Sequence, residues 1–104
     1  MPTPYRILFS KRAGSDLKAI FERIARDSPQ NAANFVARVL DTIATLKLFP
    51  HRAIVQAQHP DLKHPVRSLS VRPYIVVFRV VEKHRIVRIL QVRHGARRRP
   101  DRFE

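Results

Sequence analysis

Arginine supplies most of the binding chemistry that this sequence offers. The chain has 21 lysine and arginine residues, 16 of them arginine, against 8 acidic residues, so its formal net charge is +13. The excess is uneven: residues 66–104 hold 11 basic and 3 acidic side chains (net +8), whereas residues 1–65 hold 10 and 5 (net +5). Guanidinium groups bind phosphates and carboxylates through paired hydrogen bonds. We therefore expect an anionic partner, whether nucleic acid, an acidic protein or a membrane surface, although the charge could serve solubility alone.

Two arginines and one histidine stand out by their place in apolar stretches. Arg79 interrupts the run Tyr74–Val81, where a buried and unpaired guanidinium is very costly. It must therefore find a carboxylate, reach the rim of the fold or meet an anion of a partner. Arg67 lies at the start of the preceding stretch and is less confined. His94 ends the last stretch, where it could act as an acid or base near neutral pH or only hydrogen-bond to backbone.

A basic tail covers residues 96–104 and includes Arg97, Arg98 and Arg99. Such arms are commonly either solvated or ordered by an anionic partner. No aromatic residue is interleaved with these three arginines, which argues against binding of single-stranded nucleic acid by base stacking.

Other common site chemistries are poorly supported. Residues 51–65 are expected to be irregular, and His59 and His64 flank Asp61 there. This segment offers a single carboxylate and no pair of ligands at helical spacing, so its ligand geometry for a metal ion is weak. We predict no metal site and no cofactor. The absence of cysteine excludes disulfides and thiolate metal sites and fits a reducing compartment. No hydrophobic signal region or membrane-length apolar segment is seen, so we expect a cytoplasmic protein.

The N-terminal half predicts one strand and two helices that could position these groups. Alternation over Tyr5–Phe9 indicates a short strand, after which Ser10 can cap a helix covering Lys11–Arg26. Ser28 can cap a second helix, which begins with a favourable proline and covers Pro29–Leu48. Two helices joined by so short a turn are expected to be antiparallel neighbours.

Three large apolar residues, Phe21, Phe35 and Leu40, lie beside the apolar seams of these helices. They could widen the core-facing stripe, or they could line a groove for a partner's helix. Asp16 falls in the first turns of the first helix, where the helix dipole favours a negative charge.

The C-terminal half predicts three strands, Val66–Val71, Tyr74–Val81 and Ile86–His94. The middle one is apolar on both faces, which is typical of a central strand. Sequential strands usually pair, so these three should form an antiparallel meander, with the first strand at an edge. The predicted fold is α+β in the order β-α-α-β-β-β, a helical hairpin packed on a mainly antiparallel four-stranded sheet, forming one domain over residues 1–104.

Strict alternation in the last strand assigns its side chains to two faces. It places Leu90 and Val92 on the face of Arg88, and Val87 and Ile89 on the opposite one. It also places Gln91 and Arg93 with Val87 and Ile89.

The order and spacing of many residues resemble the ParE/RelE toxin superfamily over nearly the whole chain. The residues that carry the resemblance are Tyr5, Ile7, Phe9, Ser10, Ala13, Asp16, Leu17, Ile20, Asp27-Ser28-Pro29, Ala32, Ala33, Phe35, Ile43, Leu46, Pro50, Val66-Arg67, Leu69, Val71, Tyr74, Val76, Phe78-Arg79-Val80, Ile89-Leu90, Val92, His94-Gly95 and Arg97. The resemblance implies a RelE/ParE-like fold. It also implies the toxin of a type II toxin–antitoxin pair, held inactive by an antitoxin with an acidic C-terminal segment. Phe21, Phe35 and Leu40 are the residues we expect such an antitoxin to contact.

The superfamily contains two activities, and the residues favour one of them. RelE-like members are ribosome-dependent mRNA endoribonucleases, and Arg67, Arg79 and His94 match positions that carry catalytic groups in some of them. Those enzymes usually add a tyrosine in the C-terminal segment, or basic and acidic catalytic residues before the second strand. The tyrosine is missing after His94 here, and only His59, Asp61, Lys63 and His64 are available before that strand. The ending Leu90-x-Val92-x-His94-Gly95-Ala96-Arg97 is instead similar to the ParE branch, which poisons DNA gyrase and needs no acid–base set.

The resemblance therefore favours a ParE-like gyrase inhibitor. The alternatives are a RelE-like ribonuclease and a basic nucleic-acid-binding module. The residues expected to bind the target are Arg67, Arg79, Arg93, His94, Arg97, Arg98 and Arg99.

Overall fold

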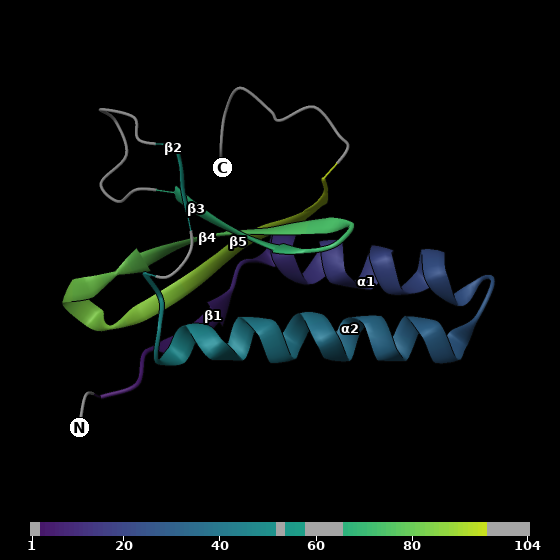
Figure 1. The fold of residues 1–104 in the computed structure, drawn as a ribbon, viewed down its shortest axis with the longest axis horizontal. Helices are drawn as coiled ribbons and strands as arrows, with labels where there is room; N and C mark the ends of the chain where they lie inside the picture. The colour runs from purple at the N-terminus through teal and green to yellow at the C-terminus, as the bar shows by residue number, and fades with distance from the viewer. Residues whose placement is uncertain (1–2, 52–53, 58–65, 96–104) are drawn as a thin grey trace.

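The computed structural model describes residues 3–51, 54–57 and 66–95. Its two long helices lie together against one face of a single twisted sheet (Figure 1). The strand order in the sheet is β1-β5-β4-β3-β2, so β4 lies in the middle. The predicted α+β class, with a helical hairpin on a mainly antiparallel sheet, is confirmed.

Helix α1 covers Lys11–Ala25 and begins where the sequence predicts. The Ser10 hydroxyl oxygen accepts the N–H of Ala13 at 3.0 Å and donates its own proton to the carbonyl of Leu90 at 2.8 Å. The capping residue therefore also ties the start of the helix to the sheet.

Helix α2 covers Pro29–Ala44 and is capped by Ser28, whose hydroxyl accepts the N–H of Asn31 at 3.1 Å. It ends four residues before the predicted Leu48, because the chain tightens into a 3-10 helix, η1, over Thr45–Lys47. None of the helices in the described ranges is long and apolar enough to cross a membrane.

The last three strands have the predicted bounds, with β3 at Val66–Val71, β4 at Tyr74–Val81 and β5 at Ile86–His94. They pair as an antiparallel meander, and the turn between β4 and β5 holds a 3-10 helix, η2, over Glu82–His84. The first strand, β1 (Arg6–Phe9), pairs in parallel with β5 at the edge of the sheet, as expected.

One strand was not predicted. β2 covers Ile54–Ala57, inside the segment expected to be irregular, and pairs antiparallel with β3, so the sheet has five strands instead of four. Four residues are too few to establish an alternating pattern, and pairing with β3 decides the conformation.

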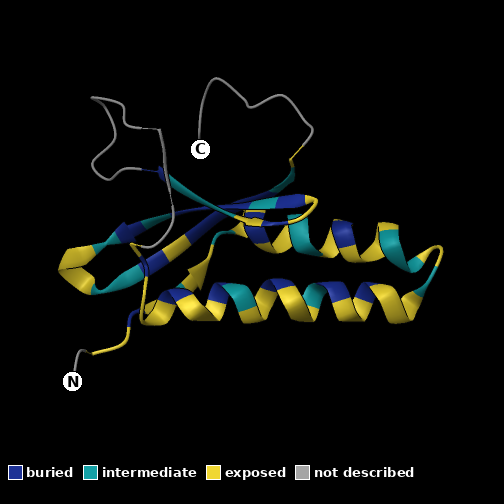
Figure 2. Ribbon diagram, in the orientation of Figure 1, coloured by how far each residue is buried: buried dark blue, intermediate teal, exposed yellow. Residues whose placement is uncertain are grey.

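The core lies between the helices and the sheet, where the helix surfaces turned toward the sheet are buried (Figure 2). Phe78 of β4 and Val39 of α2 are wholly buried in it. A second, smaller cluster on the outer face of the sheet joins Val66, Val77 and Leu90. Both faces of β4 are therefore covered along much of its length, as predicted.

The predicted alternation of β5 fails at Leu90. Val77 pairs with Gln91 and Phe78 pairs with Ile89, so Leu90 is an extra residue in a β-bulge. A bulge shifts the side-chain period by one. Val92 consequently packs in the helix-side core with Ile89, whereas Leu90 and Gln91 both belong to the outer face.

Candidate functional site

Three arginines project from the outer face of the sheet, on the side away from the helices. Arg79 of β4 lies directly opposite Arg88 of β5, and Arg93 lies opposite Ile75 on the same face. We call Arg79, Arg88 and Arg93 the arginine face. Like charges that are directly opposite on neighbouring strands destabilise a sheet, so the pair Arg79–Arg88 is a cost that an anionic partner would remove.

Polar atoms on this face lack partners within the described residues. Arg79 Nε, Arg93 Nε and Gln91 Oε1 are buried and make no hydrogen bond there. Arg79 and Arg93 are half-buried overall, while Arg88 is exposed. Such unsatisfied groups are uncommon in folded proteins and call for an explanation. Binding of an anion is one such explanation.

The other two predicted site residues lie elsewhere. Arg67 is opposite Phe78, so it projects from the helix-facing side of β3, the reverse of the face that carries Arg79. His94 is opposite Tyr74, and the two rings meet edge to face at 5.2 Å between centroids. Tyr74 is five residues from Arg79, which is about 17 Å along a strand. Arg67, Arg79 and His94 are therefore not brought together into one catalytic cluster.

A small cleft opens between α1 and the end of β5. It has a volume of about 110 Å³, and the polar residues that line it are Arg12, Asp16, Arg23, Tyr74, Arg93 and His94. We call it the α1 cleft. Arg12 and Arg23 were not predicted as site residues. Arg12, Asp16 and Arg23 nevertheless recur at helical spacing beside the apolar seam and could have been found as a polar stripe.

The dipole interpretation of Asp16 is wrong, because the described first turn of α1 holds no acidic residue. The Asp16 carboxylate instead accepts the backbone N–H of Val92 at 2.9 Å and lies 4.0 Å from Arg12 Nε. It caps the edge of β5 where β1 has ended, since β1 pairs only as far as Ile89.

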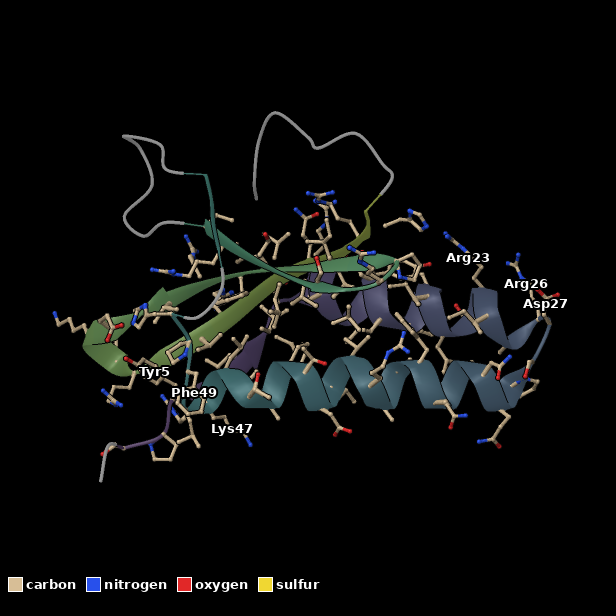
Figure 3. The ribbon with its side chains drawn as sticks, viewed as in Figure 1. Tyr5, Arg23, Arg26, Asp27, Lys47 and Phe49 are labelled. Carbon is tan, nitrogen blue, oxygen red and sulfur yellow. The ribbon has the colours of Figure 1, made fainter. Side chains whose placement is uncertain are left out.

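Tyr5 lies toward the other end of the sheet (Figure 3), where it belongs to a hydrogen-bonded cluster around Glu82. Glu82 accepts the hydroxyl proton of Tyr5 at 2.7 Å and also pairs with His51. The bond from Tyr5, helped by His51, holds the pKa of Glu82 below its usual range. The same bond, together with burial, raises the pKa of Tyr5. The Arg85 guanidinium covers the Tyr5 ring at 4.3 Å, so the cluster ties the N-terminal strand to the β4–β5 turn.

The residues predicted to contact an antitoxin separate into two kinds. Phe21 and Leu40 are 39% and 43% exposed on the helices, so both are open to a partner. Phe35 is only 9% exposed and packs against Tyr74 in the core, at 5.4 Å between ring centroids, so its ring is committed to packing.

The remaining predictions fall largely outside the described residues. Arg97, Arg98 and Arg99 lie outside them, as do His59, Asp61 and His64. Within the described ranges, no group of three histidine, cysteine or acidic residues could hold a metal ion.

A two-helix layer on a five-stranded sheet with a basic outer face defines a small α+β protein suited to binding anions. The family described as "ParE toxin of type II toxin-antitoxin system, parDE" matches residues 7–99. The chain therefore belongs to the ParE toxin family. A comparison with curated proteins found no match.

Solved structures from toxin–antitoxin systems share the fold. A chain from the chromosomal ParDE system of P. aeruginosa is 21% identical, with a TM-score of 0.71 over 89% of this chain and 98% of that one. The RelBE2 complex of Mycobacterium tuberculosis contains a chain with 23% identity and a TM-score of 0.66, covering 93% and 98%. The RelE–RelB complex of Pyrococcus horikoshii contains one with 18% identity and a TM-score of 0.67, covering 91% and 99%. At these identities the likeness shows the fold.

Proposed function

We propose that this chain acts in the cytoplasm as a type II toxin that inhibits DNA gyrase and is neutralised by a cognate antitoxin. The observation that carries the proposal is the match of the ParE toxin family to residues 7–99. Inhibition of this kind requires binding of a target rather than turnover of a substrate, so no complete acid–base set is needed.

The positions of the predicted catalytic residues favour this proposal over a RelE-like ribonuclease. Cleavage of RNA needs a base, an acid and a cationic group within reach of one phosphate. Arg67 and Arg79 lie on opposite faces of the sheet, and His94 pairs with Tyr74 near the far end of β4. A single phosphate held by Arg79 would therefore not meet His94.

The arginine face is the proposed contact with the gyrase–DNA complex. Arg79 and Arg93 were predicted as target-binding residues, and Arg88 joins them because it lies directly opposite Arg79. The basic tail with Arg97, Arg98 and Arg99 extends the predicted contact along the chain. An anionic target would relieve the repulsion within the pair Arg79–Arg88 and give partners to Arg79 Nε and Arg93 Nε.

The proposed antitoxin is a small protein with an acidic C-terminal segment. The structures of similar fold from M. tuberculosis and P. horikoshii are complexes of a toxin with an antitoxin. A net charge of +13 favours an acidic partner. The exposed rings and methyl groups of Phe21 and Leu40 offer apolar contact on the helices.

Expression in a bacterial host tests the proposal against the ribonuclease. We expect growth arrest with a DNA-damage response and intact mRNA, and rescue by the antitoxin encoded in the neighbouring reading frame. Codon-positioned cuts in mRNA that disappear in Arg67→Ala or His94→Ala would instead establish the ribonuclease.

A further inference from the structure

The α1 cleft carries a surplus of positive charge that the protein itself does not neutralise. Arg12, Arg23 and Arg93 are among its lining residues, together with His94. The single carboxylate among the lining residues is that of Asp16. With His94 neutral, the lining charge is +3 from the arginines and −1 from Asp16, a surplus of +2.

The contacts of Asp16 leave most of this charge available. One carboxylate oxygen of Asp16 accepts the Val92 N–H at 2.9 Å, and the distance from this oxygen to Arg12 Nε is 4.0 Å, longer than a hydrogen bond. Asp16 is thus engaged mainly with backbone. Its pairing with Arg12 is loose, and no ion pair within the described residues joins it to Arg23 or Arg93.

The donors on the opposite wall are also only partly used. Arg23 donates to the Tyr74 hydroxyl oxygen at 3.4 Å, which is long for a hydrogen bond, so this contact uses little of the capacity of either group. Arg93 Nε is buried without a hydrogen-bond partner among the described residues. Arg93 also belongs to the arginine face, so this residue stands where the outer face of the sheet meets the cleft.

We propose that the α1 cleft binds a phosphate group of a nucleic-acid backbone, with Arg12, Arg23 and Arg93 as its cationic contacts. The cleft, with a volume of about 110 Å³, has room for one such group. A phosphate presents oxygens in several directions and can accept from α1, Tyr74 and β5 together, whereas a carboxylate presents two in one plane. A nucleic-acid strand that crosses the arginine face would reach the cleft through Arg93.

This inference rests on the proposed function only in taking DNA as the source of the phosphate. The two can fail separately, because phosphate binding is measured without gyrase. Gyrase inhibition is measured without reference to the cleft.

A matched pair of arginine variants tests the proposal. Arg23 lines the cleft, whereas Arg26, at the helix end beside Asp27, does not (Figure 3). Arg23→Gln and Arg26→Gln each remove one positive charge, so long-range attraction to DNA falls equally in both. We expect Arg23→Gln to weaken binding of a short labelled DNA duplex at least about fivefold, and to reduce the slope of log affinity against log salt by about one. Arg26→Gln should weaken it less than about twofold.

Asp16→Asn should change the affinity for the duplex in the opposite direction. The amide oxygen can still accept the Val92 N–H, while the negative charge is lost, so duplex affinity should rise. In the full-length chain, NMR with inorganic phosphate should move the signals of Val92 N–H and the Tyr74 ring in the wild type, and less in Arg23→Gln. Circular dichroism checks that each variant is folded.

Three results would overturn the proposal. The first is an equal loss of duplex affinity in Arg23→Gln and Arg26→Gln. The second is a shift of the cleft signals with inorganic phosphate but not with the duplex, which would remove DNA as the source. The third is a shift of these signals only with an acidic peptide, which would make the cleft a carboxylate site for a protein partner.

Discussion

Two arginines directly opposite each other are an unusual pairing for a sheet, and Arg79 and Arg88 form such a pair on the outer face. Like charges in this position destabilise the pairing of the strands. A side chain that lowers stability and lacks an internal partner is a candidate for binding. The pair Arg79–Arg88 is therefore unfavourable for folding but available for binding an anion.

We predict that Arg88→Gln stabilises the fold by up to about 1 kcal/mol at low ionic strength while it weakens inhibition of the target. The gain should shrink in about 1 M salt, where the screening length falls to about 3 Å. Urea unfolding at both salt concentrations measures the first effect. Lys83→Gln is the control, because Lys83 is an exposed residue of η2, outside the strand pair. A loss of stability in Arg88→Gln at low salt would contradict this account of the pair.

Glu82 makes a second residue-scale prediction, which concerns pH. Its pKa in the folded chain lies below the ordinary value of 4.5, chiefly because Tyr5 donates a hydrogen bond to it. A depressed carboxyl pKa stabilises the fold above the unfolded-state value, and the contribution is lost as the pH falls through the folded value. We therefore expect a part of the acid destabilisation below about pH 4.5 to disappear in Glu82→Gln.

At alkaline pH the same bond acts through Tyr5, whose pKa is raised above 10.0. A raised pKa contributes stability below pH 10.0 that is lost as the pH rises through the folded value. Thermal unfolding of wild type, Glu82→Gln and Tyr5→Phe from pH 3 to pH 11 measures how stability depends on pH on the acid and on the alkaline side. An identical loss of stability at acid pH in the wild type and Glu82→Gln would refute the assigned role of Glu82.

At the scale of elements, the two glycines of the chain have opposite roles. A Cβ atom at Gly95 would lie 3.1 Å from the Pro73 carbonyl oxygen, the same oxygen that accepts the Gly95 N–H at 2.7 Å. That contact closes the end of β5 against the β3–β4 turn, and the oxygen cannot retreat without loss of the bond. A Cβ atom at Gly14, on an exposed turn of α1, would meet nothing within 4 Å.

We predict that Gly95→Ala destabilises the fold by roughly 1 kcal/mol through overpacking. Gly14→Ala should stabilise it by about 0.5–1 kcal/mol, because alanine has the better helix propensity. Chemical denaturation of the two variants gives both free energies of unfolding. If both variants change the free energy of unfolding in the same direction, the contact between Gly95 and Pro73 does not prevent a larger side chain at position 95.

Strand positions were predictable where the apolar pattern is long, and β3, β4 and β5 begin and end at the predicted residues. β2 was not, because four residues carry no periodic signal and its conformation depends on pairing with β3. The bulge at Leu90 was also missed. Strict alternation assumes one residue on each strand per pair, and a sequence does not show where two residues oppose one.

At the scale of the whole molecule, the sign of the partner's charge followed from composition, but the grouping of the charges did not. Arg79 and Arg93 share a face with Arg88, while Arg67 lies on the reverse. These assignments depend on strand register and on the bulge, both of which are set by tertiary packing. The cleft formed by Arg12, Arg23 and Arg93 joins a helix to a distant strand, so spacing along the chain alone could not reveal it.

The central claim is that this chain acts on gyrase, and purified gyrase tests it most directly. Relaxed plasmid, gyrase and ATP are incubated with increasing amounts of the folded chain, and both supercoiled and cleaved DNA are quantified. We predict loss of supercoiling with accumulation of gyrase-dependent cleaved DNA, with weaker effects for Arg88→Gln. Full supercoiling and no cleaved DNA at a large molar excess of the folded chain would contradict the claim.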